Sequence, residues 1–304
     1  MTAVVEVRNL HKEYGDTVAV DDVSFSIEEG EIFGILGPNG AGKTTTVECV
    51  EGLRQRDRGE VTVLGFDPQV ERAEITRQLG VQLQDGQLPD RMRVAEALSL
   101  YSSFYSNPRD WQELMDALSL TGKAKTPYSK LSGGQKQRLS VALALVGNPK
   151  VAVLDELTTG LDPAARHETW ELIETVRASG VSILLVTHFM EEAERLCDRI
   201  ALIDKGRVAA IDTPSGLISR VESEQRIHFR PSTSFDDSLL TRLPDVTSVA
   251  RQGEYVVVTG NNNSLNVVTS ALADAKVEPM NLRVEQATLE NAFLALTQND
   301  HHSK

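Results

Sequence analysis

The chain has 304 residues, of which 40% are hydrophobic and 25% charged, ordinary values for a globular protein, and its length favours one large and one small domain. Its formal net charge of -13 argues against a nucleic-acid partner, because binding to phosphates needs clustered lysines and arginines. No run of about 18 or more apolar residues occurs and the first residues lack a signal-peptide pattern, so we expect a chain that stays inside the cell and does not span a membrane.

The opening stretch, residues 4–31, predicts antiparallel strands. Apolar and polar residues alternate in VVEVRNLHKEYG and again in TVAVDDVSFSIEEGE. This alternation is typical of strands with one buried and one solvated face. We expect a small antiparallel sheet beside the main one.

Three short apolar runs predict buried parallel strands, and helical spacing between them indicates an α/β fold. The runs are residues 31–36 before Gly37, residues 151–154 before Asp155, and residues 181–187 before His188. In open parallel sheets the ligand lies beyond the carboxyl ends of the strands. We therefore expect the residues after these runs to converge on one edge as the active site.

A complete phosphate-binding loop follows the first of these runs. It reads Gly37-Pro38-Asn39-Gly40-Ala41-Gly42-Lys43-Thr44, with Thr45 as the next candidate contact. The glycines let backbone N–H groups surround phosphate oxygens at a helix N-terminus, Lys43 offers a positive charge, and Thr44 offers a hydroxyl to Mg²⁺. The loop predicts a P-loop NTPase fold but no particular reaction, since kinases and small GTPases share it.

The next segment interrupts the strand pattern. Residues 93–105 and 110–119 have helical spacing and are separated by Asn107-Pro108, so we expect a helical insertion over about residues 85–140. A further helix is predicted over residues 164–179, because Asp162-Pro163 precedes it and Gly180 ends it.

A second anion-binding turn lies at the end of the insertion. The sequence Leu131-Ser132-Gly133-Gly134-Gln135-Lys136-Gln137-Arg138-Leu139 resembles the signature of the ATP-binding cassette (ABC) family. A serine followed by two glycines at a helix start also suits an anion, because free N–H groups and the positive end of the helix dipole face it. The resemblance implies that Ser132, Gly133, Gly134 and Gln135 close over a nucleotide held by a second copy of the chain.

The remaining motifs of that family follow in order over residues 4–217. The apolar run before Asp155-Glu156 resembles the Walker B strand, which implies Asp155 as a Mg²⁺ ligand and Glu156 as the general base for the attacking water. Thr158-Thr159-Gly160-Leu161-Asp162 resembles the D-loop at the dimer interface, and His188 matches the histidine that contacts the γ-phosphate.

Two further matches each leave an alternative. Gln84 in Leu79-Gly80-Val81-Gln82-Leu83-Gln84 resembles the Q-loop glutamine, near Mg²⁺ and the attacking water, with Gln82 as its competitor. Tyr14 resembles the aromatic residue that stacks on adenine, although a packing role is the alternative. Leu157 departs from the family, which usually has proline there, so the loop after Glu156 gains freedom in φ and a backbone N–H.

A smaller unit is expected over residues 218–304, after the cassette of residues 1–217. Its pattern predicts strands at 225–230, 246–251, 255–259 and 277–284, and helices at 236–242, 265–275 and 289–297. The first six elements have the β-α-β-β-α-β order of a ferredoxin-like fold. No ligand motif occurs there, so we expect an accessory or regulatory α+β domain.

Two stretches favour a subfamily. Residues 187–200 and the terminal segment of residues 287–294 resemble ATPases of bacterial daunorubicin-resistance type drug exporters. That resemblance implies ATP and Mg²⁺ as ligands, a homodimer in the ATP-bound state, and a separate membrane permease at the cytoplasmic face of the membrane. A soluble cassette ATPase acting on a macromolecular complex, such as iron-sulfur assembly, and an importer ATPase are the alternatives.

Overall fold

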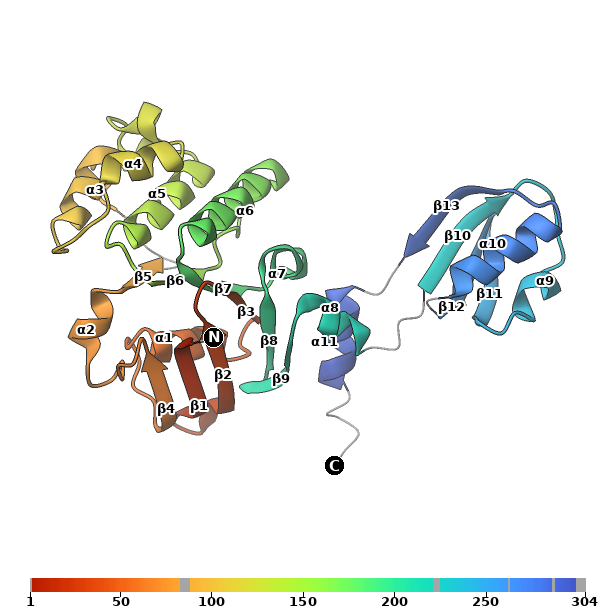
Figure 1. Ribbon diagram of the computed structural model, residues 1–304, viewed down its shortest axis with the longest axis horizontal. Coiled ribbons are helices and arrows are strands. Elements are labelled where there is room, and N and C mark those ends of the chain that lie inside the picture. Colours follow the sequence, from red (N-terminus) through yellow and green to blue (C-terminus); the bar gives the residue numbers. More distant parts are fainter. Residues whose placement is uncertain (1, 83–87, 221–224, 262, 286–287, 299–304) are drawn as a thin grey trace. The chain divides into compact units, whose positions relative to one another are not determined.

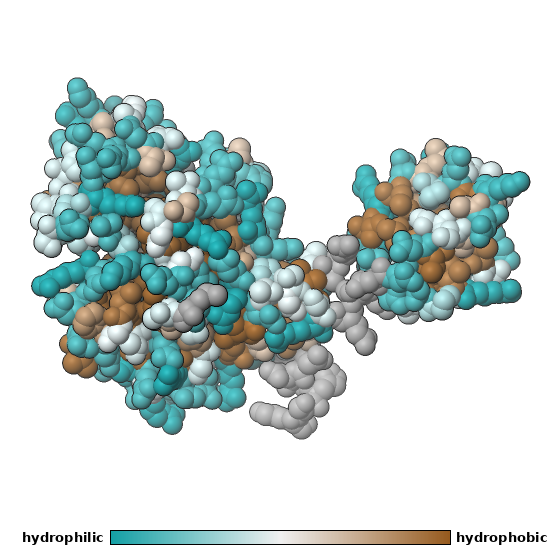
Figure 2. All heavy atoms as spheres, in the orientation of Figure 1, coloured by the Kyte–Doolittle hydropathy of each residue, from teal (hydrophilic) through white to brown (hydrophobic). Residues whose placement is uncertain are grey.

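The computed structural model describes residues 2–82, 88–220, 225–261, 263–285 and 288–298, which form two compact units (Figure 1). The first unit comprises Met1–Pro214 and the second comprises Ser215–Lys304. Within the described residues, no helix is long and apolar enough to cross a membrane. Figure 2 shows a mainly hydrophilic surface, with hydrophobic patches between the polar residues.

The first unit is built on a six-stranded sheet with the order β5-β6-β7-β3-β8-β9. The first five strands are parallel and β9 runs antiparallel to β8, so the predicted mainly parallel sheet is confirmed. The strands are β3 (Ile32–Leu36), β5 (Leu79–Gln82), β6 (Val151–Asp155), β7 (Ser182–Thr187), β8 (Arg199–Asp204) and β9 (Arg207–Asp212). Every residue of β3, β6 and β7 is buried, which is why these strands appear as continuous apolar runs.

A three-stranded antiparallel sheet with the order β2-β1-β4 lies beside it, as the alternation predicts. Its strands are β1 (Ala3–Tyr14), β2 (Thr17–Glu28) and β4 (Arg58–Val63). Their apolar faces share one core with β3 and with helix α1 (Lys43–Val50), and the rings of Phe25 and Phe33 stack with centroids 5.2 Å apart. Burying each such side chain contributes about 1.5–3 kcal/mol, so the core fixes the strand that precedes the phosphate loop.

The predicted helical insertion is present among the described residues. Its elements are α3 (Val94–Ser102), α4 (Trp111–Ala117), the 3₁₀ turns Thr121–Lys123 and Tyr128–Lys130, and α5 (Gly133–Leu145), while the short α2 (Arg72–Thr76) precedes β5. Helix α4 begins after Asp110, whose carboxylate accepts the N–H of Gln112. Helix α5 packs closely on β5, because a Cβ at Gly80 would lie 2.2 Å from the carbonyl oxygen of Ala144.

Two helices flank the carboxyl ends of β6 and β7. Helix α6 (Pro163–Ala178) is capped by Asp162, which accepts the N–H of Ala165, and α7 (Met190–Leu196) follows β7. The indole N–H of the buried Trp170 donates to the buried carboxylate of Glu192 at 3.1 Å. This bond joins α6 to α7, and α7 begins two residues after His188.

The second unit contains a four-stranded antiparallel sheet with the order β11-β12-β10-β13. Its elements are α8 (Pro214–Ser219), β10 (Gln225–Pro231), α9 (Ser238–Thr241), β11 (Val246–Gln252), β12 (Tyr255–Gly260), α10 (Ser264–Asp274), β13 (Pro279–Glu285) and α11 (Leu289–Gln298). In chain order from β10 to β13, this is the ferredoxin-like arrangement. Helices α9 and α10 pack on the sheet around Phe229, Val258 and Leu272 (Figure 1). Helix α9 is shorter than the predicted 236–242. The Asp236 side chain accepts the N–H of Ser238, the first helical residue, so the helix begins after the two aspartates.

The two cysteines of the chain, Cys49 and Cys197, are buried and unpaired with each other. Burial raises the pKa of the Cys49 thiol to about 11 and also raises that of Cys197. The Cys197 sulfur fills the space beside Gly34 in β3, where a Cβ would lie 2.7 Å from it. Both residues therefore serve as packing groups of the core.

Candidate nucleotide-binding site

The phosphate loop joins β3 to α1 in a shape that only glycine allows at two positions. Gly42 has a φ of 97°, and a Cβ there would lie 2.3 Å from the carbonyl oxygen of Ala19. A Cβ at Gly37 would lie 2.1 Å from the carbonyl oxygen of Ile203. The loop therefore lies against β2 on one side and the end of β8 on the other, so its N–H groups are held in place at the start of α1.

Lys43 is held inside this loop. Its side chain is buried, and its ammonium donates to the carbonyl oxygens of Gly37 at 2.8 Å and Pro38 at 3.0 Å. Burial lowers the pKa of Lys43, while the charges of Glu156 and Asp155 oppose that shift. The lysine thus provides a fixed positive charge at the place where the loop would meet the outer phosphates of a nucleotide.

A cavity of about 340 Å³ opens in front of the loop. Its lining consists of Ala19, Asn39, Gly40, Gly42, Lys43, Thr44, Thr45 and Glu156. A glycine-rich helix start, a lysine and two hydroxyl groups are donors suited to phosphate oxygens, so these residues fit the triphosphate of a nucleotide. The structure thus brings six of the predicted loop residues (Asn39, Gly40, Gly42, Lys43, Thr44 and Thr45) and Glu156 to one cavity, whereas Gly37, Pro38 and Ala41 are not among its lining residues.

Asp155 ends β6 and is 9% exposed. Burial, and then the charge of Glu156, raises the pKa of Asp155 to about 6, against the opposing effect of Lys43. A divalent cation would favour the ionised form of such a carboxyl group, and a carboxylate with a threonine hydroxyl is a hard oxygen donor set. Asp155 and Thr44 therefore fit Mg²⁺.

Glu156 has a left-handed backbone, with a φ of 48°. Its N–H donates to the carbonyl oxygen of Val186 at 2.9 Å, and its own carbonyl accepts the N–H of Thr159 at 3.2 Å. This conformation costs a non-glycine residue about 1–2 kcal/mol, which the surrounding hydrogen bonds offset. The carboxylate Oε1 lies 3.3 Å from Nδ1 of His188, so side chains that follow β6 and β7 meet at this edge of the sheet.

The signature turn has a capping box. The N–H of Gln135 donates to the hydroxyl of Ser132 at 3.3 Å, and the Gln135 side chain accepts the N–H of Ser132 at 3.1 Å. Gly133 faces Leu161 and Gly134 faces Ala165, at the start of α6. Among the described residues that line the 340 Å³ cavity, none comes from this turn or is Asp162. A single chain therefore presents the two anion-binding turns at separate places.

Of the two glutamine candidates for the Q-loop, only Gln82 is among the described residues. Gln84 lies outside the described residues. Gln82, its competitor, is 3% exposed and its side-chain oxygen accepts the N–H of Asp155 at 3.0 Å. Gln82 thus supports the end of β6, a role that the sequence does not reveal because it depends on the pairing of β5 with β6.

Tyr14 ends β1 and is 42% exposed, so its ring is not a core residue. The ammonium of Lys12 lies 5.4 Å from the ring centroid, and the guanidinium carbon of Arg54 lies 5.5 Å from it. Tyr14 is not among the residues of the cavity at the phosphate loop. An accessible aromatic ring with cations nearby is compatible with stacking on a base.

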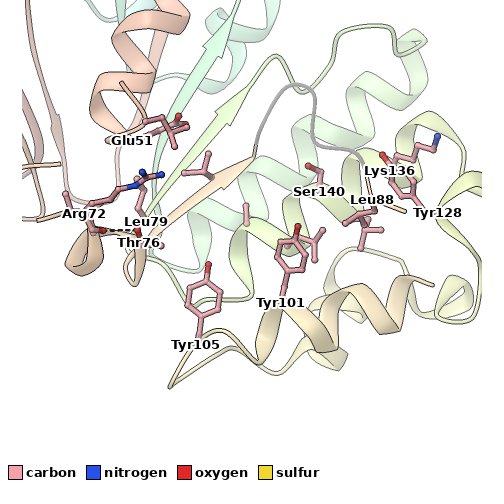
Figure 3. A pocket seen from close by; sticks show the side chains of 16 residues that line it. Glu51, Arg72, Thr76, Leu79, Leu88, Tyr101, Tyr105, Tyr128, Lys136 and Ser140 are labelled. Atoms are coloured by element: carbon pink, nitrogen blue, oxygen red, sulfur yellow. Dashed lines mark hydrogen bonds between the residues drawn. The ribbon is translucent and has the colours of Figure 1, made fainter. Parts of the chain in front are cut away.

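A second cavity, of about 280 Å³, lies between the end of α1 and the helical insertion, and we call it the tyrosine groove (Figure 3). Tyr101, Tyr105 and Tyr128 line it together with Glu51, Arg72 and Lys136. Figure 3 shows Tyr101 and Tyr105 projecting from the insertion into this space. Glu51 is 9% exposed, and burial, then Asp155 and Glu48, raises its pKa to about 8 from an ordinary 4.5.

Replacing Glu51 by glutamine is expected to stabilise the protein at alkaline pH. The folded state holds the Glu51 proton more tightly than the unfolded chain does, so the free energy of unfolding falls as the pH rises from about 4.5 to about 8. The variant lacks this loss, so its Tm should exceed that of the parent by a few degrees at pH 8.5 and approach it near pH 4.5. Thermal unfolding at both pH values measures this. Glu113→Gln, at an exposed site, is the control, and an equal Tm difference at both pH values would contradict the prediction.

The chain is similar in sequence to known proteins. The family described as "ABC transporter" matches residues 20–159. The Nod factor export ATP-binding protein I of Sinorhizobium fredii is 45% identical over 220 residues, or 70% of this chain and 64% of that protein, so the match spans less than two thirds of that relative. The linearmycin resistance ATP-binding protein LnrL of Bacillus subtilis is 33% identical over 307 residues, covering 97% of this chain and 98% of that protein.

Solved structures show the same fold. The cbiO1 protein of Clostridium perfringens, part of the ABC transporter complex cbiONQ, has a TM-score of 0.66 and 27% identity over 72% of this chain and 92% of that one. A dimeric ATP-binding cassette in a post-hydrolysis state, bound to ADP and Pi, has a TM-score of 0.61 and 26% identity over 69% of this chain and 98% of that one. These matches agree with the phosphate loop, with Asp155 and Glu156 at the end of β6, and with the sheet order. The chain belongs to the ABC transporter family and is one of its ATP-binding subunits, which are ATPases.

Proposed function

We propose that the chain binds Mg-ATP at the phosphate loop and hydrolyses it as a homodimer to power export through a separate membrane permease. The observation that carries this proposal is the 340 Å³ cavity in which Lys43 and Glu156 meet the N-terminus of α1. Phosphoryl transfer depends mainly on positioning and on stabilising charge, and the cavity provides both.

Each residue of the site has a distinct task in this proposal. The loop N–H groups and Lys43 hold and stabilise the phosphate charge, and Tyr14 stacks on adenine. Glu156 accepts a proton from the attacking water, and His188, 3.3 Å from the Glu156 carboxylate, contacts the γ-phosphate. Mg²⁺, held by Thr44, Asp155 and Gln84, would neutralise charge on the phosphate oxygens.

A second copy completes the site. The signature turn and Asp162 lie outside the cavity of their own chain, which leaves the start of α5 available to a nucleotide on another chain. A related cassette has been solved as a dimer with ADP and Pi. Two chains facing each other would enclose two nucleotides, each between one phosphate loop and one signature turn.

Export through a permease at the cytoplasmic face of the membrane is supported by the relatives. Both the Nod factor and linearmycin proteins are named for export or resistance, and the second of them matches nearly the whole chain, including the second unit. This favours an exporter over a soluble cassette or an importer. The tyrosine groove is our proposed docking site for the permease, since it lies at the border of the helical insertion.

Docking can be tested with Tyr101→Ala. The chain would be co-expressed with candidate permease subunits and purified through a tag on those subunits. We expect the variant to co-purify poorly while the isolated chain keeps its ATPase rate. Undiminished co-purification would count against the groove, and ATP-independent export by the assembled complex would count against the function.

The second unit, residues 218–304 in our division, is proposed to assist dimer contact or regulate hydrolysis. It has its own core around Phe229 and Leu272, and no metal-binding group of His, Cys, Asp or Glu occurs among its described residues. Deleting residues 218–304 should therefore change dimerisation or the ATPase rate. If both stay unchanged, the unit has another role.

A further inference from the structure

A side-chain hydrogen bond ties the signature helix to the loop of the proposed base. Gln137 lies in α5, half-buried, and its side-chain N–H donates to the carbonyl oxygen of Leu157 at 2.6 Å. Leu157 directly follows Glu156 and is fully buried. Gln137 is not among the residues that line the phosphate-loop cavity, and this backbone contact gives it a route to the site.

The loop after Glu156 depends on such contacts for its shape. Glu156 has a φ of 48°, a region that non-glycine residues adopt only when their surroundings impose it. The N–H of Glu156 is fixed to Val186 and its carbonyl to Thr159. The next carbonyl, that of Leu157, is the one that Gln137 holds. Three consecutive anchors thus fix the backbone that carries the carboxylate.

Leu157 makes the third anchor more important. A proline at this position would fix φ by its ring, whereas leucine leaves φ free in the loop. The hydrogen bond from Gln137 restrains the same residue at its carbonyl group. Gln137 therefore supplies part of the restraint on this loop that a proline ring at position 157 would provide.

We infer that Gln137 is a positioning residue for hydrolysis, which holds Glu156 in its left-handed conformation through the carbonyl of Leu157. The inference rests on the proposed role of Glu156 as the base. Because the reacting geometry tolerates little displacement, loosening this loop should slow the chemical step more than it weakens ATP binding.

The test compares Gln137→Met with Gln112→Met. Methionine keeps the length and the helix propensity of glutamine and removes the donor. Gln112 is exposed on α4, so its substitution is the matched control. We expect kcat of the Gln137 variant to fall about tenfold, with KM for ATP changed less than twofold, which corresponds to losing one hydrogen bond in the transition state. Gln137→Leu, which also lacks the donor and adds no charge, should show the same loss and serves if the methionine variant does not fold.

A double variant distinguishes positioning from general damage. Added to Glu156→Gln, the Gln137→Met change should lower the residual rate less than twofold, because the group that it positions is already gone. A full tenfold loss in that background, or a parent-like kcat of both Gln137 variants, would overturn the inference while leaving the role of Glu156 intact. Parent-like hydrolysis by Glu156→Gln alone would instead overturn the role of Glu156, and the inference with it.

Discussion

Replacing Glu156 by glutamine is expected to lower the ATPase rate by about 10²–10⁴-fold and to trap an ATP-bound dimer. Glutamine keeps the size of the side chain but cannot accept the proton of the attacking water. Lys43 and the loop glycines remain, so Mg-ATP should still bind and the closed pair should persist. ATPase assays and light scattering after gel filtration, with and without Mg-ATP, measure the two effects.

Glu171→Gln is the matched control for this experiment, since Glu171 is exposed on α6 and away from the cavity. It should hydrolyse ATP at the parent rate and give no stable dimer. If Glu156→Gln behaves like Glu171→Gln, Glu156 is not the base. The cassette would then hydrolyse ATP without Glu156 as base, and the altered loop at Leu157 would be the place to look for the reason.

Replacing Gly42 by alanine is expected to abolish measurable ATP binding. The new Cβ would lie 2.3 Å from the carbonyl oxygen of Ala19 and 3.3 Å from the Cα of Gly206, and the backbone has a φ of 97°. Relieving this contact requires the loop to leave β2, which displaces Lys43 and the start of α1. Overpacking and backbone strain together should cost about 2–5 kcal/mol of stability. Isothermal titration with ATP and urea unfolding measure the two losses.

Gly40→Ala separates the two causes. Gly40 also has a positive φ, of 79°, but a Cβ there would meet nothing within 4 Å. Its replacement should cost only the backbone strain, about 1–2 kcal/mol, and should reduce ATP affinity less than the Gly42 change. Equal losses in the two variants would show that contact with Ala19 is not what requires glycine at position 42.

The parts of the fold that the sequence predicts are those governed by local pattern. Strands β6 and β7 are buried along their whole length and therefore appear as apolar runs, and Asp162-Pro163 marks the start of α6 within one residue. The convergence of Lys43, Glu156 and His188 follows from these runs, because parallel strands end at one edge.

The parts that the sequence does not predict depend on contacts between distant segments. The left-handed backbone of Glu156 arises from its bond to Val186, 30 positions away, and no residue type near it signals that conformation. The roles of Gln82 and Gln137 likewise require knowing which strand and which loop lie beside them. Polar residues with such roles cannot be told from solvated ones by spacing alone.

The buried cysteines give the protein a practical property. Maleimide reagents react with exposed thiolates, and neither Cys49 nor Cys197 is exposed or readily ionised, since burial raises the pKa of both thiols. A cysteine introduced at an exposed position, such as Gln112 on α4 or Glu254 in the second unit, should thus accept a fluorophore selectively without removal of the native residues. The wild-type chain is in effect a ready background for site-specific labelling, and a single fluorophore on either unit would report on that unit while ATP is turned over.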